Sequence, residues 1–246
     1  SGETLGSVER FDLKTNRWSD VGSLRIPRSR LSLVALNGKL YAVSGMKAEG
    51  HGHEALNTPS IEEYDPAKNA WRIAGSLNHA RHGFGVSVWH RCIYVFGGND
   101  GESERSGEVW DPMTGKSVDL PNMPSKRGFP GVVQVDGRLV CFGGRSVSAH
   151  PSALDPDTLR WSDVPVPDID LNRTVSTLIG GKLWTIGGES RSRSPIIQSF
   201  DLTAWHTKPL VAISARFPLP DIKETPNSAI RNPKSEIRNS LYPHGV

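Results

Sequence analysis

Cysteines, long apolar runs and an excess of one charge are all scarce in these 246 residues, and each scarcity excludes a class of protein. Two cysteines are too few for a disulfide framework, and unpaired thiols slightly favour a cytoplasmic location. No apolar run approaches the ~18 residues of a membrane-spanning helix, and no secretory signal peptide follows Ser1. The 29 basic and 26 acidic residues leave a net charge of +3, so we expect neither a nucleic-acid nor a membrane partner.

Glycine is abundant, with 25 residues, and much of it belongs to a repeat. Short apolar runs end in a glycine pair, or in Ser-Gly in the first copy, at 44–45, 97–98, 143–144 and 187–188. An aspartate after a bulky apolar residue recurs in step, at Asp12, Asp65, Asp111, Asp155 and Asp201. The copies lie 44 to 53 residues apart, a period that predicts a solenoid or a propeller.

The pattern within one period favours a propeller. Residues 31–73 contain four short apolar segments separated by turn signals. Asn37-Gly38 is the strongest signal for a two-residue hairpin, and Asp65-Pro66 marks a second turn. No stretch has a sustained apolar period of about 3.6 residues. Four short antiparallel strands per period are typical of a propeller blade, so we predict an all-β fold.

Two segments carry a resemblance to a known family. Residues 81–112 contain Arg-His-Gly-Phe-Gly, Ile-Tyr-Val-Phe-Gly-Gly and Val-Trp-Asp-Pro, and residues 27–71 repeat the pattern with Asn-Gly-Lys-Leu-Tyr-Ala-Val-Ser-Gly. Both resemble kelch repeats of the galactose-oxidase-like propeller superfamily, and the resemblance extends over about residues 7–206. It implies a kelch-type β-propeller. Most kelch propellers are binding platforms and a minority are enzymes, so we expect a non-catalytic module that binds a protein or peptide.

The predicted propeller occupies residues 1–217. Four complete four-stranded blades are expected at about 25–73, 79–119, 126–163 and 172–206, after the outer strands of a partial blade at 7–20. The family usually has six or seven blades, so the ring is expected to be incomplete. A fragment or degenerate copy of a longer kelch protein is one interpretation. Residues 218–246 are polar and lack the repeat, which predicts a disordered tail.

The long, variable loops indicate where a ligand would bind. They join the second strand of a blade to the third, and the fourth strand to the next blade, and strand alternation places both kinds at one end of the blade. An arginine recurs before the first strand, at Arg28, Arg81, Arg127 and Arg173. The four could form a basic ring around the central channel that binds a carboxylate, or they could be part of the blades themselves.

Arg30 differs from its counterparts in the other copies. It completes Pro-Arg-Ser-Arg at 27–30, which is similar to the segment of BTB-linked kelch proteins whose second arginine contacts acidic peptides. The remaining binding candidates in the long loops are His82, Asn99, Asp100, Arg145 and Glu189.

Two other kinds of chemistry are possible in these loops. A carboxylate such as Asp100 or Glu189 beside an arginine could transfer protons, and bacterial sialic-acid mutarotases resemble this fold. A carbohydrate ligand, with a mutarotase or epimerase activity, is therefore the alternative. His51, His53 and His79 could meet His82 in a metal site. A polar loop explains these histidines more simply, so we predict no metal and no cofactor.

Overall fold

Short antiparallel strands make up the regular structure of the chain. The computed structural model describes residues 4–48, 55–145, 150–164, 173, 175–180, 182–186 and 197–201. Within these ranges there is no helix, and therefore none that could cross a bilayer. The predicted all-β fold is confirmed.

Three four-stranded sheets follow one another along the chain, each with its strands paired in sequence order. The first blade contains β3 (Ser32–Leu36), β4 (Lys39–Val43), β7 (Ser60–Asp65) and β8 (Ala70–Ser76). The second contains β9 (Gly85–Trp89), β10 (Cys92–Phe96), β13 (Gly107–Asp111) and β14 (Lys116–Leu120). The third contains β15 (Gly131–Val135), β16 (Arg138–Phe142), β17 (Ser152–Asp155) and β18 (Arg160–Asp163).

Smaller sheets lie at both ends of this series and in its long loops. A two-stranded half-blade of β1 (Val8–Asp12) and β2 (Arg17–Val21) comes first. The fourth blade has three described strands, β19 (Val175–Ile179), β20 (Lys182–Ile186) and β21 (Ile197–Asp201). Short ribbons pair β5 (Met46–Ala48) with β6 (Ala55–Asn57), and β11 (Asn99–Asp100) with β12 (Glu102–Ser103). The fourth strand and the tail predicted after residue 201 lie outside the described residues.

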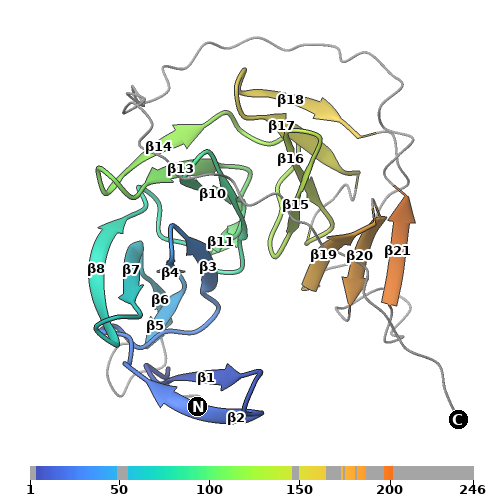
Figure 1. Cartoon of the computed structure of the whole chain (residues 1–246). Helices are drawn as coiled ribbons and strands as arrows, with labels where there is room; N and C mark the ends of the chain where they lie inside the picture. Colours follow the sequence, from blue (N-terminus) through green and yellow to red (C-terminus); the bar gives the residue numbers. More distant parts are fainter. Residues whose placement is uncertain are drawn as a thin grey trace, which may run out of the picture.

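The blades stand side by side in an arc (Figure 1). Their first strands, β3, β9, β15 and β19, are neighbours along the inside of the arc. In the described part of the chain the arc does not close into a ring, as the sequence predicts. Where they are described, the long loops of successive blades therefore meet at one end of a shared centre. We call this end the mouth.

Local sequence explains the tight turns at the opposite end of each sheet. Asn37 and Gly38 have φ values of 52° and 73°, and Asp136 and Gly137 have 47° and 74°. Two consecutive positive φ values are the signature of a type I′ turn, which matches the twist of the strands that it joins. The second blade makes the same turn with His90 and Arg91, although neither residue favours it.

Aromatic side chains join the blades. Tyr41 of the first blade contacts Trp110 of the second at 5.5 Å between ring centroids, and Phe96 of the second contacts Trp161 of the third at 5.6 Å. Trp110 is fully buried in this way. In the half-blade, Phe11 and Trp18 pair across β1 and β2 as Tyr64 and Trp71 do across β7 and β8, but they are 36% and 66% exposed because no described blade covers them.

Candidate functional site

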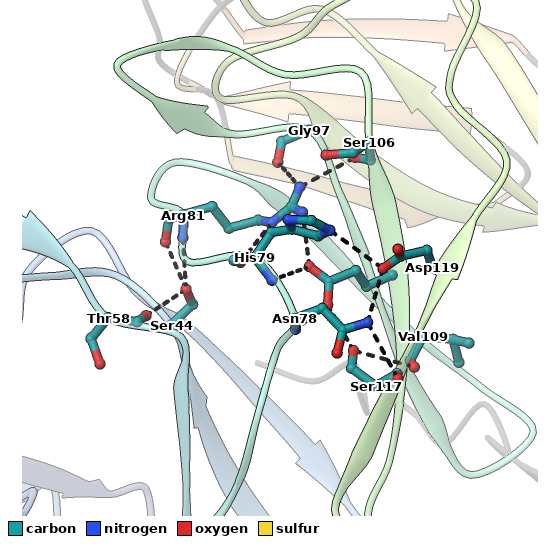
Figure 2. Close-up of polar contacts among 11 residues, drawn as sticks. Ser44, Thr58, Asn78, His79, Arg81, Gly97, Ser106, Val109, Ser117 and Asp119 are labelled. Carbon is teal, nitrogen blue, oxygen red and sulfur yellow. Dashed lines mark hydrogen bonds and ion pairs between the residues drawn. The ribbon is translucent and has the colours of Figure 1, made fainter.

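A buried arginine holds the loop that leads into the second blade (Figure 2). Arg81 is 1% exposed, and its guanidinium donates to the carbonyl oxygen of Gly97 at 2.7 Å. It also forms an ion pair with Glu108 at 2.8 Å, and Glu108 is itself fully buried. The same carboxylate accepts hydrogen bonds from the backbone N–H groups of Asn78 and His79, at 2.6 and 3.1 Å. The pair therefore fixes the loop against the sheet.

The first blade repeats this arrangement. Arg28 pairs with buried Glu62 at 2.7 Å, and Glu62 accepts from the backbone N–H groups of Arg25 and Ile26. Arg28 also donates to the Ser44 carbonyl at 3.0 Å. Burial lowers the pKa of the Arg28 guanidinium and Glu62 raises it, but an arginine remains charged in any folded protein.

The third blade keeps the arginine but not the glutamate. Arg127 is fully buried and donates to the carbonyl oxygens of Gly143 and His150, while Ser152 occupies the position of Glu62 and Glu108. All three arginines thus donate to the carbonyl 16 residues later in the chain. All three side chains are buried.

Arg173 does not belong to this series, which corrects the alignment expected from the sequence. It lies two residues before the first strand of its blade, whereas Arg28, Arg81 and Arg127 lie four residues before theirs. Its φ of 59° matches the 52° of Arg30, which also lies two residues before a first strand. Arg173 is therefore the counterpart of Arg30, and both side chains are exposed.

One residue from each blade occupies this second position, and together they surround the mouth. The four residues, Arg30, Gly83, Phe129 and Arg173, all have positive φ, from 52° to 59°. They line a cavity of about 440 Å³. The rest of its lining is Leu31, Ser32, Phe84 and Pro130. The cavity therefore combines an apolar floor with arginines from its first and last blades.

Phe129 organises the positive charge on one side of the cavity. The guanidinium of Arg173 lies over its ring at 4.9 Å from the centroid, and that of Arg145 lies at 5.9 Å. Such cation–π contacts hold an arginine in place without neutralising it. The predicted candidates Arg145 and Arg173 are thus brought together by a residue that the sequence analysis did not select.

His82 connects Arg30 to the neighbouring loops. Its Nε2 lies 3.2 Å from Nη1 of Arg30, and its Nδ1 lies 2.8 Å from Oδ1 of Asn57. Because guanidinium only donates, Nε2 accepts from Arg30 and Nδ1–H donates to Asn57. Burial and then Arg30 lower the pKa of His82, whereas Asp100 raises it. The net lowering favours the neutral ring that this hydrogen-bond chain requires.

Asn99 and Asp100 lie at the far end of the same chain. Asn99 forms a β-bridge with His82, in which its N–H donates to the His82 carbonyl at 2.9 Å. Asn57 Nδ2 donates to Oδ1 of Asp100 at 2.9 Å. Glu189, the other carboxylate of the carbohydrate hypothesis, lies outside the described residues. The structure therefore gives that hypothesis one carboxylate, already hydrogen-bonded to an amide.

The predicted histidine cluster is separated where the structure describes it. His79 lies 3.6 Å from Asp119 of β14 in the second blade, and His82 contacts Arg30 and Asn57 instead. His51 and His53 fall outside the described residues. Across the described ranges, no three histidine, cysteine or acidic side chains are grouped as metal ligands would be.

Three residues that contact the candidate side chains were not predicted from the sequence: Met46, Asn57 and Phe129. Met46 Sδ lies 3.5 Å from Nη1 of Arg30. Counting back from the glycine pairs would have found Phe129, because it precedes Gly143 by the 14 residues that separate Arg30 from Ser44. The repeat also marks Met46, because it follows Ser44-Gly45 as Asn99 and Arg145 follow their glycine pairs. No periodic signal marks Asn57, because its contacts cross from one loop to another.

Comparisons with known proteins agree with this architecture. A model of the kelch motif matches residues 27–78 and 80–124. Kelch-like protein 15 of Danio rerio is 26% identical over 186 residues, which cover 67% of this chain and 31% of that protein. Kelch-like protein 34 of Homo sapiens is 26% identical over 213 residues, covering 80% and 32%. Kelch-like ECH-associated protein 1B of Danio rerio is 33% identical over 99 residues, covering 40% and 16%. The chain thus spans about a third or less of the length of these relatives.

Proposed function

The chain belongs to the kelch-repeat family, and from this premise we propose that it is a non-catalytic module that binds an acidic segment of a partner protein. The binding site is the mouth. The observation that carries the proposal is the presence of two exposed arginines, Arg30 and Arg173, in the lining of one cavity with an apolar floor.

Arg30 is suited to an anionic ligand because its present partners are weak. Its guanidinium contacts a thioether sulfur and an imidazole nitrogen. By contrast, the buried guanidinium groups of Arg28 and Arg81 each bind a carboxylate and several carbonyl oxygens. A carboxylate from a ligand would offer Arg30 a bidentate, charge-assisted pair, which is the interaction that this side chain favours most.

A protein segment fits the dimensions and the position of the site. A cavity of about 440 Å³ holds a few side chains, and the loops that surround it sit on rigid sheets. The floor of Leu31, Phe84 and Pro130 would receive an apolar side chain next to the acidic one. The name of Kelch-like ECH-associated protein 1B records a protein partner for that relative, which favours the same class of ligand here.

The test begins with selection from a random peptide library displayed on phage, using the purified chain as bait. We expect the enriched peptides to be rich in aspartate and glutamate. The Kd of the best peptide is then measured for Arg30→Gly. Glycine occupies the equivalent position in the second blade and adopts a φ of 52° without strain, so this variant keeps the backbone conformation and removes the side chain with its charge.

A matched control comes from the opposite end of the second blade. Arg91 is also an exposed arginine with positive φ, at 68°, and Arg91→Gly removes the same charge from the β9–β10 turn. We expect Arg30→Gly to weaken binding by about 1.5–3 kcal/mol, or roughly ten- to a hundredfold, and Arg91→Gly to leave it unchanged. Enrichment of neutral or basic peptides, or equal effects of the two variants, would overturn the proposal.

A further inference from the structure

The chain of hydrogen bonds through His82 gives the mouth a second property. We propose that His82 makes the affinity of the mouth for anions depend on protonation: it positions Arg30 while neutral and adds a positive charge when an anion is bound. This inference rests on the proposed function, because it concerns the same site.

The hydrogen bonds of His82 fit one tautomer of its neutral imidazole ring. Arg30 donates to Nε2 at 3.2 Å, so the proton of the ring lies on Nδ1, where Asn57 accepts it at 2.8 Å. Asn57 is fixed in turn, since its Nδ2 donates to the Asn99 carbonyl and to Asp100, both at 2.9 Å. His82 thus connects the Arg30 guanidinium to the loop that carries Asn57 and, through Asn57, to the loop that carries Asn99 and Asp100. These bonds restrict where Arg30 can point.

Charges of both signs face this ring. Arg30 lies against Nε2, and Asp100 lies beyond Asn57. On the third side, the ring centroids of His82 and Phe129 lie 6.0 Å apart in an edge-type contact. The guanidinium groups of Arg145 and Arg173 lie over the Phe129 ring. Burial and then Arg30 lower the pKa of His82, and only Asp100 opposes them. In the free protein burial and Arg30 therefore disfavour a charged imidazole.

An anion in the mouth reverses this balance. It neutralises Arg30 and Arg173 and draws Nη1 of Arg30 away from Nε2, which is then free to take a proton. Opposite charge nearby raises the pKa of a histidine, so the complex binds more protons than the free protein. Affinity for the anion must then increase as the pH falls through the pKa that His82 has in the complex, and it must level off below the pKa of the free protein.

The experiment measures the Kd of a capped hexaaspartate peptide by fluorescence anisotropy between about pH 8 and about pH 5.5. Aspartate has an ordinary pKa of about 3.9, so the peptide stays mostly ionised over this range, and any protonation of it at the lower pH would weaken binding, opposite to the expected change. We expect about a tenfold gain in affinity at the lower pH for the unmodified protein, because an adjacent charge shifts a pKa by about one or more.

Two variants separate His82 from the other histidines. The side chain of His82→Gln can still accept from Arg30 and donate to Asn57, but it cannot become charged. This variant should therefore bind the peptide at about pH 8, and its Kd should change less than about twofold at about pH 5.5. His79→Gln removes an exposed histidine on the outer side of the same loop and should keep the full pH dependence.

A measurement without ligand tests the coupling independently. In the NMR titration of the histidine side chains, Arg30→Gly should raise the pKa of His82, because a neighbouring cation is lost. Binding that is equally tight at both pH values, or a pH dependence that persists in His82→Gln, would overturn this inference and leave the proposed function intact. Absence of binding at every pH would overturn both.

Discussion

Removal of the Glu108 carboxylate is the most direct test of the buried pair that holds the second blade. In Glu108→Ala, Arg81 loses its ion-pair partner at 2.8 Å, and the hydroxyl of Ser117 loses an acceptor at 2.8 Å. The backbone N–H groups of Asn78 and His79 lose theirs as well. Arg81 itself should stay in place, held by the carbonyl oxygens of His79, Gly97 and Ser106.

The expected loss in the free energy of unfolding depends on which of these groups water can reach in the variant. Asn78 and His79 are exposed residues, so we expect water to reach their N–H groups more readily than it reaches Arg81 once the carboxylate has gone. Arg81 is 1% exposed and cannot. A buried charge that loses its partner costs about 3–5 kcal/mol, and this part should dominate the loss. That is a large fraction of the about 5–15 kcal/mol that stabilises a typical domain.

Urea denaturation followed by tryptophan fluorescence measures this loss, because Trp110 is fully buried in the same blade. The control is Glu102→Ala, which breaks the exposed pair between Glu102 and Lys126 at 2.9 Å and should cost at most about 1 kcal/mol. In a double-mutant cycle with Arg81→Met, the two buried residues should show strong coupling. The reasoning is refuted if Glu108→Ala costs no more than the control, or if the coupling energy is close to zero.

Two further predictions concern buried ionisable groups. Burial and then the hydrogen bond to Glu63 raise the pKa of Tyr41 to about 12, and Tyr94 is also raised, so absorbance titration should find late-ionising tyrosines. The earlier of these transitions should vanish in Tyr41→Phe. Tyr41 stabilises the fold fully below about pH 10, and this contribution is lost as the pH rises through about 12. Burial raises the pKa of Cys92 to about 11 and of Cys141 to about 12. Both thiols should therefore resist an aromatic disulfide reagent in the native state and react fully in denaturant, and rapid native reaction would contradict their burial.

The sequence predicts the blades well because strong local signals determine them. The hairpin signal at Asn37-Gly38 sits in the turn where it was expected, and the apolar segments around it form the strands. The exception is instructive. His90-Arg91 makes the same turn without the glycine, so the repeat, and not the turn residues, revealed the strands there.

The candidate site was harder to predict because it depends on register and on contacts between loops. The recurring arginine drew attention to Arg28, Arg81 and Arg127, which are buried in their blades. Matching by residue type also placed Arg173 in that series. Its distance of 14 residues from the glycine pair, equal to that of Arg30 from Ser44, indicates the correct position. The contact between Arg30 and His82 joins the loop before the first blade to the loop before the second blade. A sequence repeat describes one blade at a time, so it does not predict such a contact.

Two positions of the repeat, four and two residues before the first strand of each blade, have different roles. The first keeps the same residue and contact in the first three blades, and the second varies from blade to blade. At the first position the side chain points into the blade and meets the same carbonyl each time, so a change there would loosen the loop. At the second position the blade requires only a positive φ, and the side chain is directed at the mouth. Arginine, glycine, phenylalanine and arginine all satisfy that requirement in turn. The second position is therefore where the composition of the mouth can change at little cost to the fold, and an asymmetric ligand needs such an asymmetric set.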